Sequence, residues 1–462
     1  MVFSSINFLA IFLPLFLAVY YIVKRFAPVY RNTILFLFSI GFYAYGAIES
    51  KTPLYLLVIF LSVIFNYIIG KAIGKVPESG KNNGRRKALL AFGLFIDFGI
   101  LFVYKYFDFV FGTSLGLILP LGISFYTFQI GSYLIDVYRG DVPPEKSYIN
   151  LGAYIMMFPQ LIAGPIVRFS DVQKDLRKRK ETVRMFIRGV KTFIIGLTFK
   201  VVLANQIGNL WREANTIGYA SLSVPLAWMA MAAYTFQLYF DFYGYSLMAI
   251  GLGRMIGFEF PENFNDPYIS VSMTEFWRRW HMTLGTWFRE YVYIPLGGNR
   301  MGELRTYFNL FVVWMLTGFW HGADWNFVLW GFVLFVIIAI EKAGLLNKLE
   351  KNRFFGHIYM ILLIPLQWMI FAITDLSKLK VFYLRLIGIG GQNVNHSDWL
   401  LQLKSFWWLL LVALILSTGI PKKLYRKYEN SWVVYPILAG MLYLVIYLLR
   451  MGLNDPFLYF RF

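Results

Sequence analysis

Two of the four histidines in this chain have neighbours that would support acid–base chemistry. His321 lies in the stretch Gly-Phe-Trp-His-Gly-Ala-Asp-Trp-Asn, residues 318–326, and Asp324 is the only formally charged residue between Arg305 and Glu341. A neutral imidazole is the least costly base to keep in apolar sequence, because it carries no charge until it accepts a proton. His321 is therefore a candidate general base. The alternative is a core histidine that only hydrogen-bonds a neighbouring carbonyl.

His281 lies in a second unusual stretch, residues 275–300, which is rich in aromatic and basic side chains. A helical periodicity predicts one shared face for Trp277, Trp280, His281, Leu284 and Phe288, with Arg278, Gly285 and Arg289 elsewhere. Such an amphipathic helix suits the interface between a membrane and water. His281 could take part in chemistry, or it could merely hydrogen-bond within an interfacial anchor. The pattern alone leaves both open.

Other kinds of site find no support in the sequence. With no cysteine, the chain has no disulfides, no thiolate metal sites and no cysteinyl acyl-enzyme. It shows no His/Glu metal spacing, no phosphate loop and no Gly-x-Ser-x-Gly elbow, so we predict no metal. Any covalent relay must use another nucleophile. Several polar residues interrupt apolar sequence, and we expect them to pair with arginines or cap broken helices: Asp136, Asp241, Asn263, Asn265 and Asp266.

The composition determines where these residues must lie. Of 462 residues, 58% are hydrophobic and 15% are charged, whereas soluble domains carry roughly 25% charged residues. The deficit predicts apolar surface that faces lipid. The net charge of +19 lies in short loops between apolar runs, so it sets orientation in a membrane and does not indicate nucleic-acid binding.

We predict an all-α, multi-pass transmembrane protein with about eleven or twelve membrane segments, some re-entrant, because a bilayer core needs about 20 helical residues per span. The first run is expected to be a retained helix, not a signal peptide, and residues 1–462 to form one domain. These segments are drawn from thirteen apolar runs, some of them re-entrant: 1–23, 32–48, 52–70, 88–104, 109–135, 150–167, 189–211, 214–240, 306–321, 325–340, 354–374, 405–421 and 430–449.

Basic loops predict the orientation. Lys24, Arg25 and Arg31 flank the first loop, and the stretches 71–87 and 168–191 are rich in lysine and arginine. The positive-inside rule places all three in the cytoplasm and the N-terminus outside. These stretches orient the chain and contact anionic lipid, and they could also attract a polyanionic donor.

The sequence resembles the membrane-bound O-acyltransferase family, in particular its alginate O-acetylation branch, with the teichoic-acid D-alanyl transfer protein as a cousin. The resemblance covers nearly the whole chain and is strongest over 120–335. The motifs that carry it are the opening Met-Val-Phe-Ser-Ser, Gly122-Ile-Ser-Phe-Tyr126, Leu161-Ile-Ala-Gly-Pro165, Tyr239-Phe-Asp-Phe-Tyr-Gly-Tyr-Ser246, Glu262-Asn-Phe-Asn265, the block 275–300, and Trp320-His-Gly-Ala323.

The resemblance implies a catalytic role for His321 and a second retained histidine at His281. It implies a ring of tilted helices around a cytoplasmic funnel and tunnel, and acyl transfer from a cytoplasmic thioester to a hydroxyl. No cofactor is expected to stay bound. Acetyl-CoA is the expected donor substrate, with an acyl carrier protein as the alternative. Other expected partners are membrane lipid, an extracytoplasmic hydrolase-like acetyltransferase and, indirectly, a polysaccharide acceptor, in a bacterial cell membrane.

The C-terminus, Asn454-Asp-Pro-Phe-Leu-Tyr-Phe-Arg-Phe462, is unusually aromatic. It could be an interfacial anchor. The spacing Phe457-x-Tyr459-x-x-Phe462 also resembles the C-terminal motif of the small membrane companion in the D-alanylation system. A phenol is a workable oxygen nucleophile once a base removes its proton. We therefore hypothesise that Tyr459 carries the acyl group across the membrane.

Two other functions remain open at this point. One is D-alanyl or other acyl transfer to teichoic acid from a carrier protein. The other belongs to a different class, a transporter of a lipid-linked saccharide. Transporters of that kind often show inverted repeats and paired broken helices, and the sequence shows neither. The predicted function is O-acetylation of an exopolysaccharide or cell-wall polysaccharide.

Overall fold

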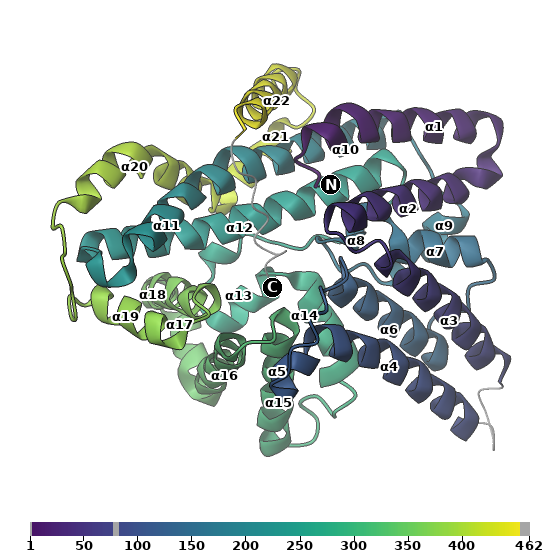
Figure 1. Cartoon of the computed structure of the whole chain (residues 1–462), viewed down its shortest axis with the longest axis horizontal. Coiled ribbons are helices and arrows are strands. Elements are labelled where there is room, and N and C mark those ends of the chain that lie inside the picture. The colour runs from purple at the N-terminus through teal and green to yellow at the C-terminus, as the bar shows by residue number, and fades with distance from the viewer. Residues whose placement is uncertain (1, 77–82, 453–462) are drawn as a thin grey trace. The chain divides into compact units, whose positions relative to one another are not determined.

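Helices account for most of the chain in the computed structural model, which describes residues 2–76 and 83–452 (Figure 1). No β-strand occurs within those two ranges. The chain is therefore an all-α, multi-pass membrane protein, as predicted. Six of the helices found there are long and apolar enough to span a membrane, and Val434–Arg450 is apolar but shorter. The six are Phe8–Phe26, Tyr55–Lys75, Gly84–Lys105, Trp325–Lys351, Arg353–Ala372 and Asp398–Leu416.

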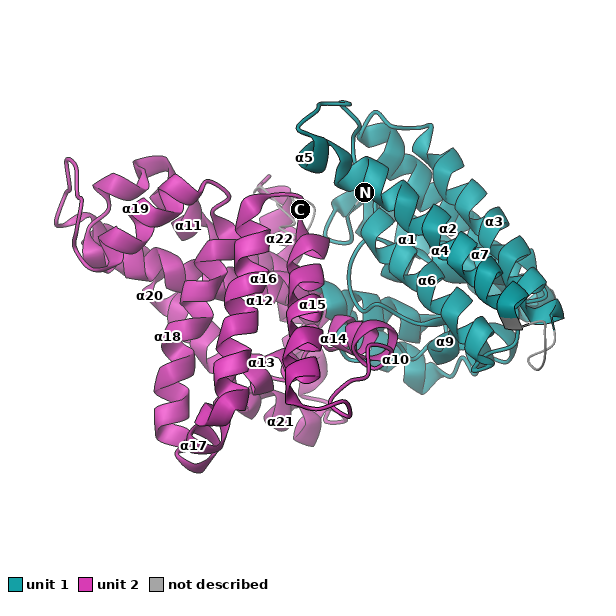
Figure 2. Ribbon diagram, turned by 90° about the horizontal axis from the view of Figure 1, so that it is seen from below, with its two compact units in different colours: residues 1–193, 245–262 teal, residues 194–244, 263–462 magenta. Residues whose placement is uncertain are grey.

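The chain divides into two compact units, each built from separate stretches of sequence (Figure 2). Unit 1 comprises residues 1–193 and 245–262. Its helices are α1 (Leu13–Phe26), α2 (Arg31–Glu49), α3 (Tyr55–Lys75), α4 (Asn83–Lys105), α5 (Phe107–Phe111), α6 (Ile123–Arg139), α7 (Tyr148–Met156), α8 (Phe158–Leu161), α9 (Phe169–Arg177) and the first part of α10 (Val183–Thr198). Short segments of π-helix and 3-10 helix are η1 (Phe8–Phe12) and η2 (Pro28–Tyr30).

Unit 2 comprises residues 194–244 and 263–462. Its helices are α11 (Asn205–Ile217), most of α12 (Val224–Met255), α13 (Met273–Arg279), α14 (Met282–Phe288), α15 (Glu303–His321), α16 (Trp325–Ile340), α17 (Leu346–Lys351), α18 (Arg353–Ala372), α19 (Leu376–Leu386), α20 (Asp398–Leu416), α21 (Gly419–Tyr428) and α22 (Val434–Arg450). Short π-helical or 3-10 segments are η4 (Phe199–Ala204), η5 (Tyr219–Ser221), η6 (Pro267–Ile269), η7 (Arg289–Tyr293) and η8 (Glu341–Leu345).

Two predicted segments are broken in unit 1. The run 109–135 is not one helix, because α5 ends at Phe111 and α6 begins only at Ile123. Gly112, at the end of α5, and Gly122, at the start of α6, both adopt positive φ, which interrupts right-handed helix. The run 150–167 is likewise divided between α7 and α8 and ends in irregular backbone.

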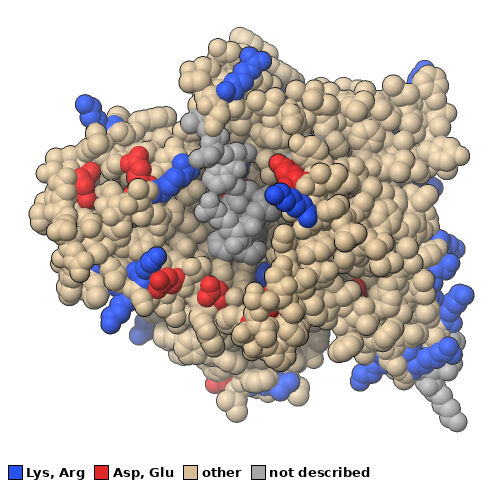
Figure 3. All heavy atoms as spheres, in the orientation of Figure 1, with Lys and Arg blue, Asp and Glu red and all other residues tan. Residues whose placement is uncertain are grey.

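Two basic parts of unit 1 lie at one end of its helices. The turn from α1 to α2 and the last residues of α3 are both at the right of Figure 1, because α1, α2 and α3 run alternately in opposite directions. On the face drawn in Figure 3, most of the surface carries neither basic nor acidic side chains. Such surface is expected of a protein that faces lipid.

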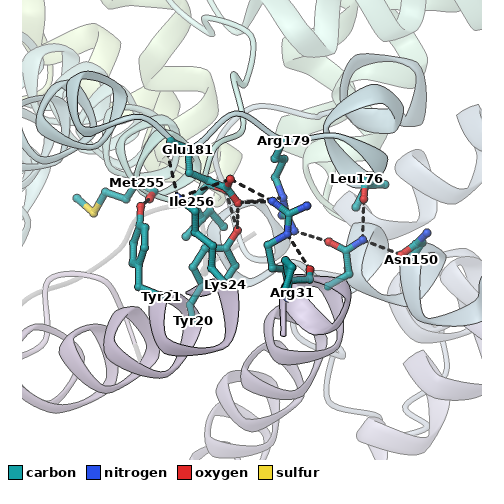
Figure 4. Close-up of polar contacts among 12 residues, drawn as sticks. Tyr20, Tyr21, Lys24, Arg31, Asn150, Leu176, Arg179, Glu181, Met255 and Ile256 are labelled. Carbon is teal, nitrogen blue, oxygen red and sulfur yellow. Dashed lines mark hydrogen bonds and ion pairs between the residues drawn. The ribbon is translucent and has the colours of Figure 1, made fainter. Parts of the chain in front are cut away.

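A buried ionic cluster ties the basic stretch 168–191 to the same end (Figure 4). The carboxylate of Glu181 accepts hydrogen bonds from Arg31 Nη1 at 2.8 Å and from the Tyr20 hydroxyl at 2.9 Å. Lys24 Nζ lies 3.8 Å from it and Arg179 Nε 4.0 Å. Three cations thus share one carboxylate. We call these residues the Glu181 cluster: Tyr20, Lys24, Arg31, Arg179 and Glu181.

The pair α15 and α16 positions the second half of the candidate site. The two helices pack side by side, and glycines remove the side chains where they cross. A Cβ on Gly318 would lie 2.4 Å from the carbonyl oxygen of Phe327, and one on Gly331 would lie 2.5 Å from that of Trp314. His321 is the last residue of α15, and the Asp324 carboxylate accepts the Trp325 N–H to begin α16. The position of His321 is therefore set by two closely packed helices.

Candidate active site

The segment around His281 is not the single helix that its periodicity predicts. Helix α13 ends at Arg279, and α14 begins at Met282. Between them His281 has φ 45° and ψ 51°, a left-handed conformation that is uncommon outside glycine. Strained residues of this kind persist only where the surrounding structure holds them, and they are frequent at functional sites.

A neighbouring segment without regular secondary structure supplies hydrogen bonds in place of the missing helical ones. The Asn265 N–H donates to the Arg279 carbonyl at 2.9 Å, and the Met282 N–H donates to the Asn263 carbonyl at 2.9 Å. These bonds lie on either side of His281. Because their partners come from 14 to 19 residues upstream, local periodicity could not reveal the break.

The side chain of Asn263 orients the His281 ring. Its Oδ1 lies 3.0 Å from His281 Nδ1, 2.9 Å from Thr283 Oγ1 and 3.4 Å from the Thr283 amide nitrogen. The Thr283 N–H is a donor, and its hydroxyl can donate as well, so this atom is well assigned as the amide oxygen. An oxygen acceptor requires a proton on Nδ1. The neutral ring therefore carries its lone pair on Nε2.

The surroundings keep His281 neutral. The residue is 2% exposed, and the Phe242 ring lies edge-on to it with centroids 4.7 Å apart. Burial lowers the pKa of His281 to about 3, because the charged form is poorly solvated there. A neutral imidazole with a fixed tautomer can hold a reacting group by accepting a hydrogen bond at Nε2, whereas a pKa this low makes it a weak general base.

His321 lies in an aromatic enclosure of its own. It is 6% exposed, and its ring meets Trp330 of α16 at 5.1 Å and Phe371 of α18 at 5.2 Å, both edge-on. The Asn326 amide fixes the distance between these helices by donating to the carbonyls of Ile370 and Phe371. The walls around His321 are therefore rigid and water-poor.

One tryptophan lies between the two histidines. The Trp320 ring centroid is 6.1 Å from that of His281 and 4.9 Å from that of His321. The structure thus brings together both histidines singled out in the sequence, within unit 2. The third predicted site residue, Tyr459, lies outside the described residues.

A pocket of about 190 Å³ opens beside His281. Tryptophans from α13 and α15 line it, together with residues of α14 and η7. The periodic set Trp277, Trp280, His281, Leu284 and Phe288 does line one surface, but Gly285 and Arg289, expected elsewhere, line it too. The left-handed turn at His281 accounts for that difference. Among the described lining residues Arg289 is the only one with a formal charge; the full lining is Trp277, Trp280, His281, Leu284, Gly285, Phe288, Arg289, Tyr293, Leu310, Val313, Trp314 and Thr317.

The other polar residues behave in two ways. Asp241 forms a buried ion pair at 2.7 Å, with Lys200 rather than an arginine, and Asp266 begins the short turn η6. The ion pair of Asp241 is a structural role, as expected, whereas the side chain of Asp266 makes no cap hydrogen bond at the start of η6. Asn263 was also expected to be structural, yet it holds the ring of His281. Its presence in the block Glu262-Asn-Phe-Asn265 was the only sequence signal for that role.

Comparison with known proteins identifies the family of this chain. The model of the MBOAT, membrane-bound O-acyltransferase family matches residues 144–346, which include both histidines. A probable alginate O-acetylase of Azotobacter vinelandii is 41% identical over 415 residues, covering 86% of this chain and 80% of the relative. A peptidoglycan O-acetyltransferase of Helicobacter pylori is 34% identical over 441 residues, covering 86% and 81%.

A more distant relative is a teichoic acid D-alanyltransferase of Streptococcus thermophilus, 32% identical over 246 residues, covering 50% of this chain and 59% of the relative. The chain belongs to the membrane-bound O-acyltransferase family. It is accordingly a multi-pass membrane enzyme of O-acyl transfer, and the two relatives above that cover 86% of this chain are O-acetylating members.

Proposed function

We propose that this enzyme moves an acetyl group from a cytoplasmic thioester to a hydroxyl, for O-acetylation of an exopolysaccharide or cell-wall polysaccharide. The names of the relatives support the reaction, since they describe acetylation of alginate and of peptidoglycan. The observation that carries the proposal is the pair of enclosed histidines joined by Trp320. Two bases in an aromatic, water-poor site suit transfer of an acyl group without loss to water.

In the proposed step, His321 takes the proton of the attacking hydroxyl. The hydroxyl oxygen bonds to the thioester carbonyl carbon, the carbon–sulfur bond breaks, and the departing thiolate receives a proton. A positioned base contributes a factor of ~10²–10⁴ to such a rate. His281, held by Asn263, orients the reacting groups with a fixed tautomer.

The pocket beside His281 supports acetyl over D-alanyl transfer. A D-alanyl group carries an ammonium, and an ammonium taken from water needs an anionic or strong hydrogen-bonding partner. The described residues that line the pocket include no aspartate or glutamate, and its one charged lining residue, Arg289, is exposed and paired with Glu290. An uncharged acetyl group meets no such penalty. Acetyl-CoA is therefore the donor we propose, and an acyl carrier protein that presents an acetyl group is the alternative.

The site would serve a polymer on the far side of a bacterial cytoplasmic membrane, with the N-terminus outside. The gathering of the first basic turn, the last residues of α3 and Arg179 at one end of unit 1 supports this orientation. Tyr459 would accept the acetyl group near His321 and pass it to an extracytoplasmic hydrolase-like partner. Tyr459→Phe keeps the ring and removes only the hydroxyl. We expect it to abolish polymer acetylation and the acetyl adduct on the C-terminal peptide, and wild-type acetylation would leave Tyr459 an anchor only.

The donor is tested with purified enzyme and radiolabelled acetyl-CoA. We expect label to leave CoA, and His321→Ala to stop the release. A parallel reaction offers D-alanyl carrier protein, from which we expect no release. Release from the D-alanyl carrier alone would favour the teichoic-acid alternative. Release from neither donor, with intact protein, would contradict both acetyl transfer from acetyl-CoA and the teichoic-acid alternative.

A further inference from the structure

We propose that Glu341 is a positioning residue for the active site, acting through the segment that carries His281. This inference rests on the proposed roles of the histidines. Glu341 lies directly after α16, inside the membrane-length helical stretch Trp325–Lys351, and is 0% exposed. A carboxylate at such a place is costly unless several donors hold it, and it therefore needs an explanation.

The donors come from the start of α13. Oε1 of Glu341 accepts the Met273 N–H at 2.6 Å, and Oε2 accepts the Thr274 N–H at 2.8 Å and the Thr274 hydroxyl at 2.6 Å. The Tyr359 hydroxyl of α18 hydrogen-bonds the same carboxylate. Charge-assisted hydrogen bonds of this kind are short and about twice as strong as neutral ones. Glu341 thus fixes the position of the first residues of α13.

The fixed segment leads directly to His281. Helix α13 has seven residues and contacts α16, where Trp277 packs edge-on against Trp330 at 5.5 Å. His281 follows two residues after the end of α13. The left-handed turn at His281 is held from the far side by Asn263. On the other side, Glu341 holds the start of α13 through Met273 and Thr274.

The same carboxylate connects the two histidines mechanically. Helix α16 begins four residues after His321 and packs tightly against α15, whose last residue is His321. The helix that carries Glu341 is therefore also the helix that encloses His321 through Trp330. Loss of the Glu341 contacts would let α13 shift along α16 and change the placement of His281 relative to His321.

A purely structural role makes a different prediction, which a matched control reveals. Asp398 also uses its carboxylate to accept a backbone N–H and a hydroxyl, both from Ser223, at the start of α12 in the same unit. These two bonds of Asp398 involve neither the segment of His281 nor that of His321. Glu341→Gln and Asp398→Asn make the same chemical change, and both should lower the melting temperature. Only Glu341→Gln should change catalysis.

The experiment measures kcat and KM for acetyl-CoA in the wild type and in both variants, with melting temperatures in the same detergent. We expect Glu341→Gln to lower kcat by about 10- to 100-fold with little change in KM, because misplacement of about 1 Å costs this much in rate. Asp398→Asn should keep wild-type kcat. Wild-type kcat in Glu341→Gln, or equal losses in the two variants, would overturn the proposal.

Two further variants keep the test decisive. If Glu341→Gln does not fold, Thr274→Val removes one of the three donors that α13 supplies, and a smaller loss of kcat is expected. In the double variant Glu341→Gln with His281→Ala, kcat should match that of His281→Ala alone, because the two residues act through one path. A loss of kcat in the double variant equal to the product of the two single losses would contradict that path. Failure of the proposed function is distinguishable, since the wild-type enzyme would then release no label from acetyl-CoA.

Discussion

Buried charge and buried histidine are handled differently in two regions of this chain. In the Glu181 cluster of unit 1, three cations share one carboxylate, and the interactions fix a basic stretch to the ends of α1 and α2. Around His281 and His321 in unit 2, the titratable rings are surrounded by aromatic side chains, and an amide oxygen replaces a carboxylate as the partner of His281.

The difference shows how each region is suited to a different task. Ion pairs among three cations and one carboxylate hold backbone in place but leave no group ready to accept a proton. A neutral imidazole next to amide and aromatic groups stays able to accept one. We therefore expect substitutions in the Glu181 cluster to change stability, and substitutions of the histidines to change rate.

The largest effect is expected from His321→Ala. Loss of the general base should lower polymer acetylation in cells by about 10²–10⁴-fold while expression and melting temperature stay nearly unchanged. Acetyl content of the polymer, measured after alkaline release, checks this. Activity above a tenth of wild type would contradict the assignment.

His281→Ala should lower kcat by less than His321→Ala, since we assign it an orienting role. Asn263→Ala should have a weaker effect in the same direction, because it frees the ring to adopt the other tautomer but leaves the imidazole in place. Steady-state kinetics on the three variants give the ranking. An equal or greater loss in His281→Ala would exchange the roles of the two histidines.

Glu181→Gln should destabilise unit 1 by about 3 to 5 kcal/mol, the usual result when one partner of a buried ion pair is removed. Lys24, Arg31 and Arg179 would lose their shared counter-charge. Thermal unfolding in detergent measures the loss, and the kcat of the folded enzyme should be unchanged. A variant with normal stability would mean that the cluster is not a structural device.

The pH dependence of folding should report the burial of His281. Its ordinary pKa of 6.5 applies to the unfolded chain, and the folded value is about 3. As the pH falls below 6.5, the unfolded state binds a proton that the folded state does not, so the free energy of unfolding decreases down to about pH 3. His281→Gln should therefore lose stability less steeply on acidification. If the stabilities of the wild type and of His281→Gln fell equally between pH 7 and pH 5, His281 would be protonated in the folded state, and the prediction would be wrong.

The smallest effect concerns the exposed part of the basic stretch. Arg179 is buried in the Glu181 cluster, and Arg177 lies 3.6 Å from Glu145, so neither tests attraction of the donor. Lys178 and Lys180 are exposed. Changing both to Gln should raise the KM for acetyl-CoA about two- to fourfold at low salt, typical of exposed charges, and added salt should remove the difference. An unchanged KM would limit this stretch to orientation and lipid contact.

The sequence was sufficient for some of these features and insufficient for others. Membrane segments and the two histidines are visible because hydropathy and an isolated titratable residue are local properties. The turn at His281 was missed because its hydrogen bonds come from Asn263 and Asn265. In the sequence, Glu341 only marks the end of an apolar run. The structure shows that its carboxylate accepts hydrogen bonds from the first residues of α13. The same holds for the burial of Arg179, which composition counted as a loop charge.

The comparison between the two regions is tested most directly by single-turnover release of label from radiolabelled acetyl-CoA, with His321→Ala and Glu181→Gln measured at equal amounts of folded protein. We predict that His321→Ala loses release while Glu181→Gln keeps the wild-type rate despite its lower melting temperature. Release above a tenth of wild type in His321→Ala, or an equal loss in Glu181→Gln, would contradict the assignment of the chemistry to the histidine region.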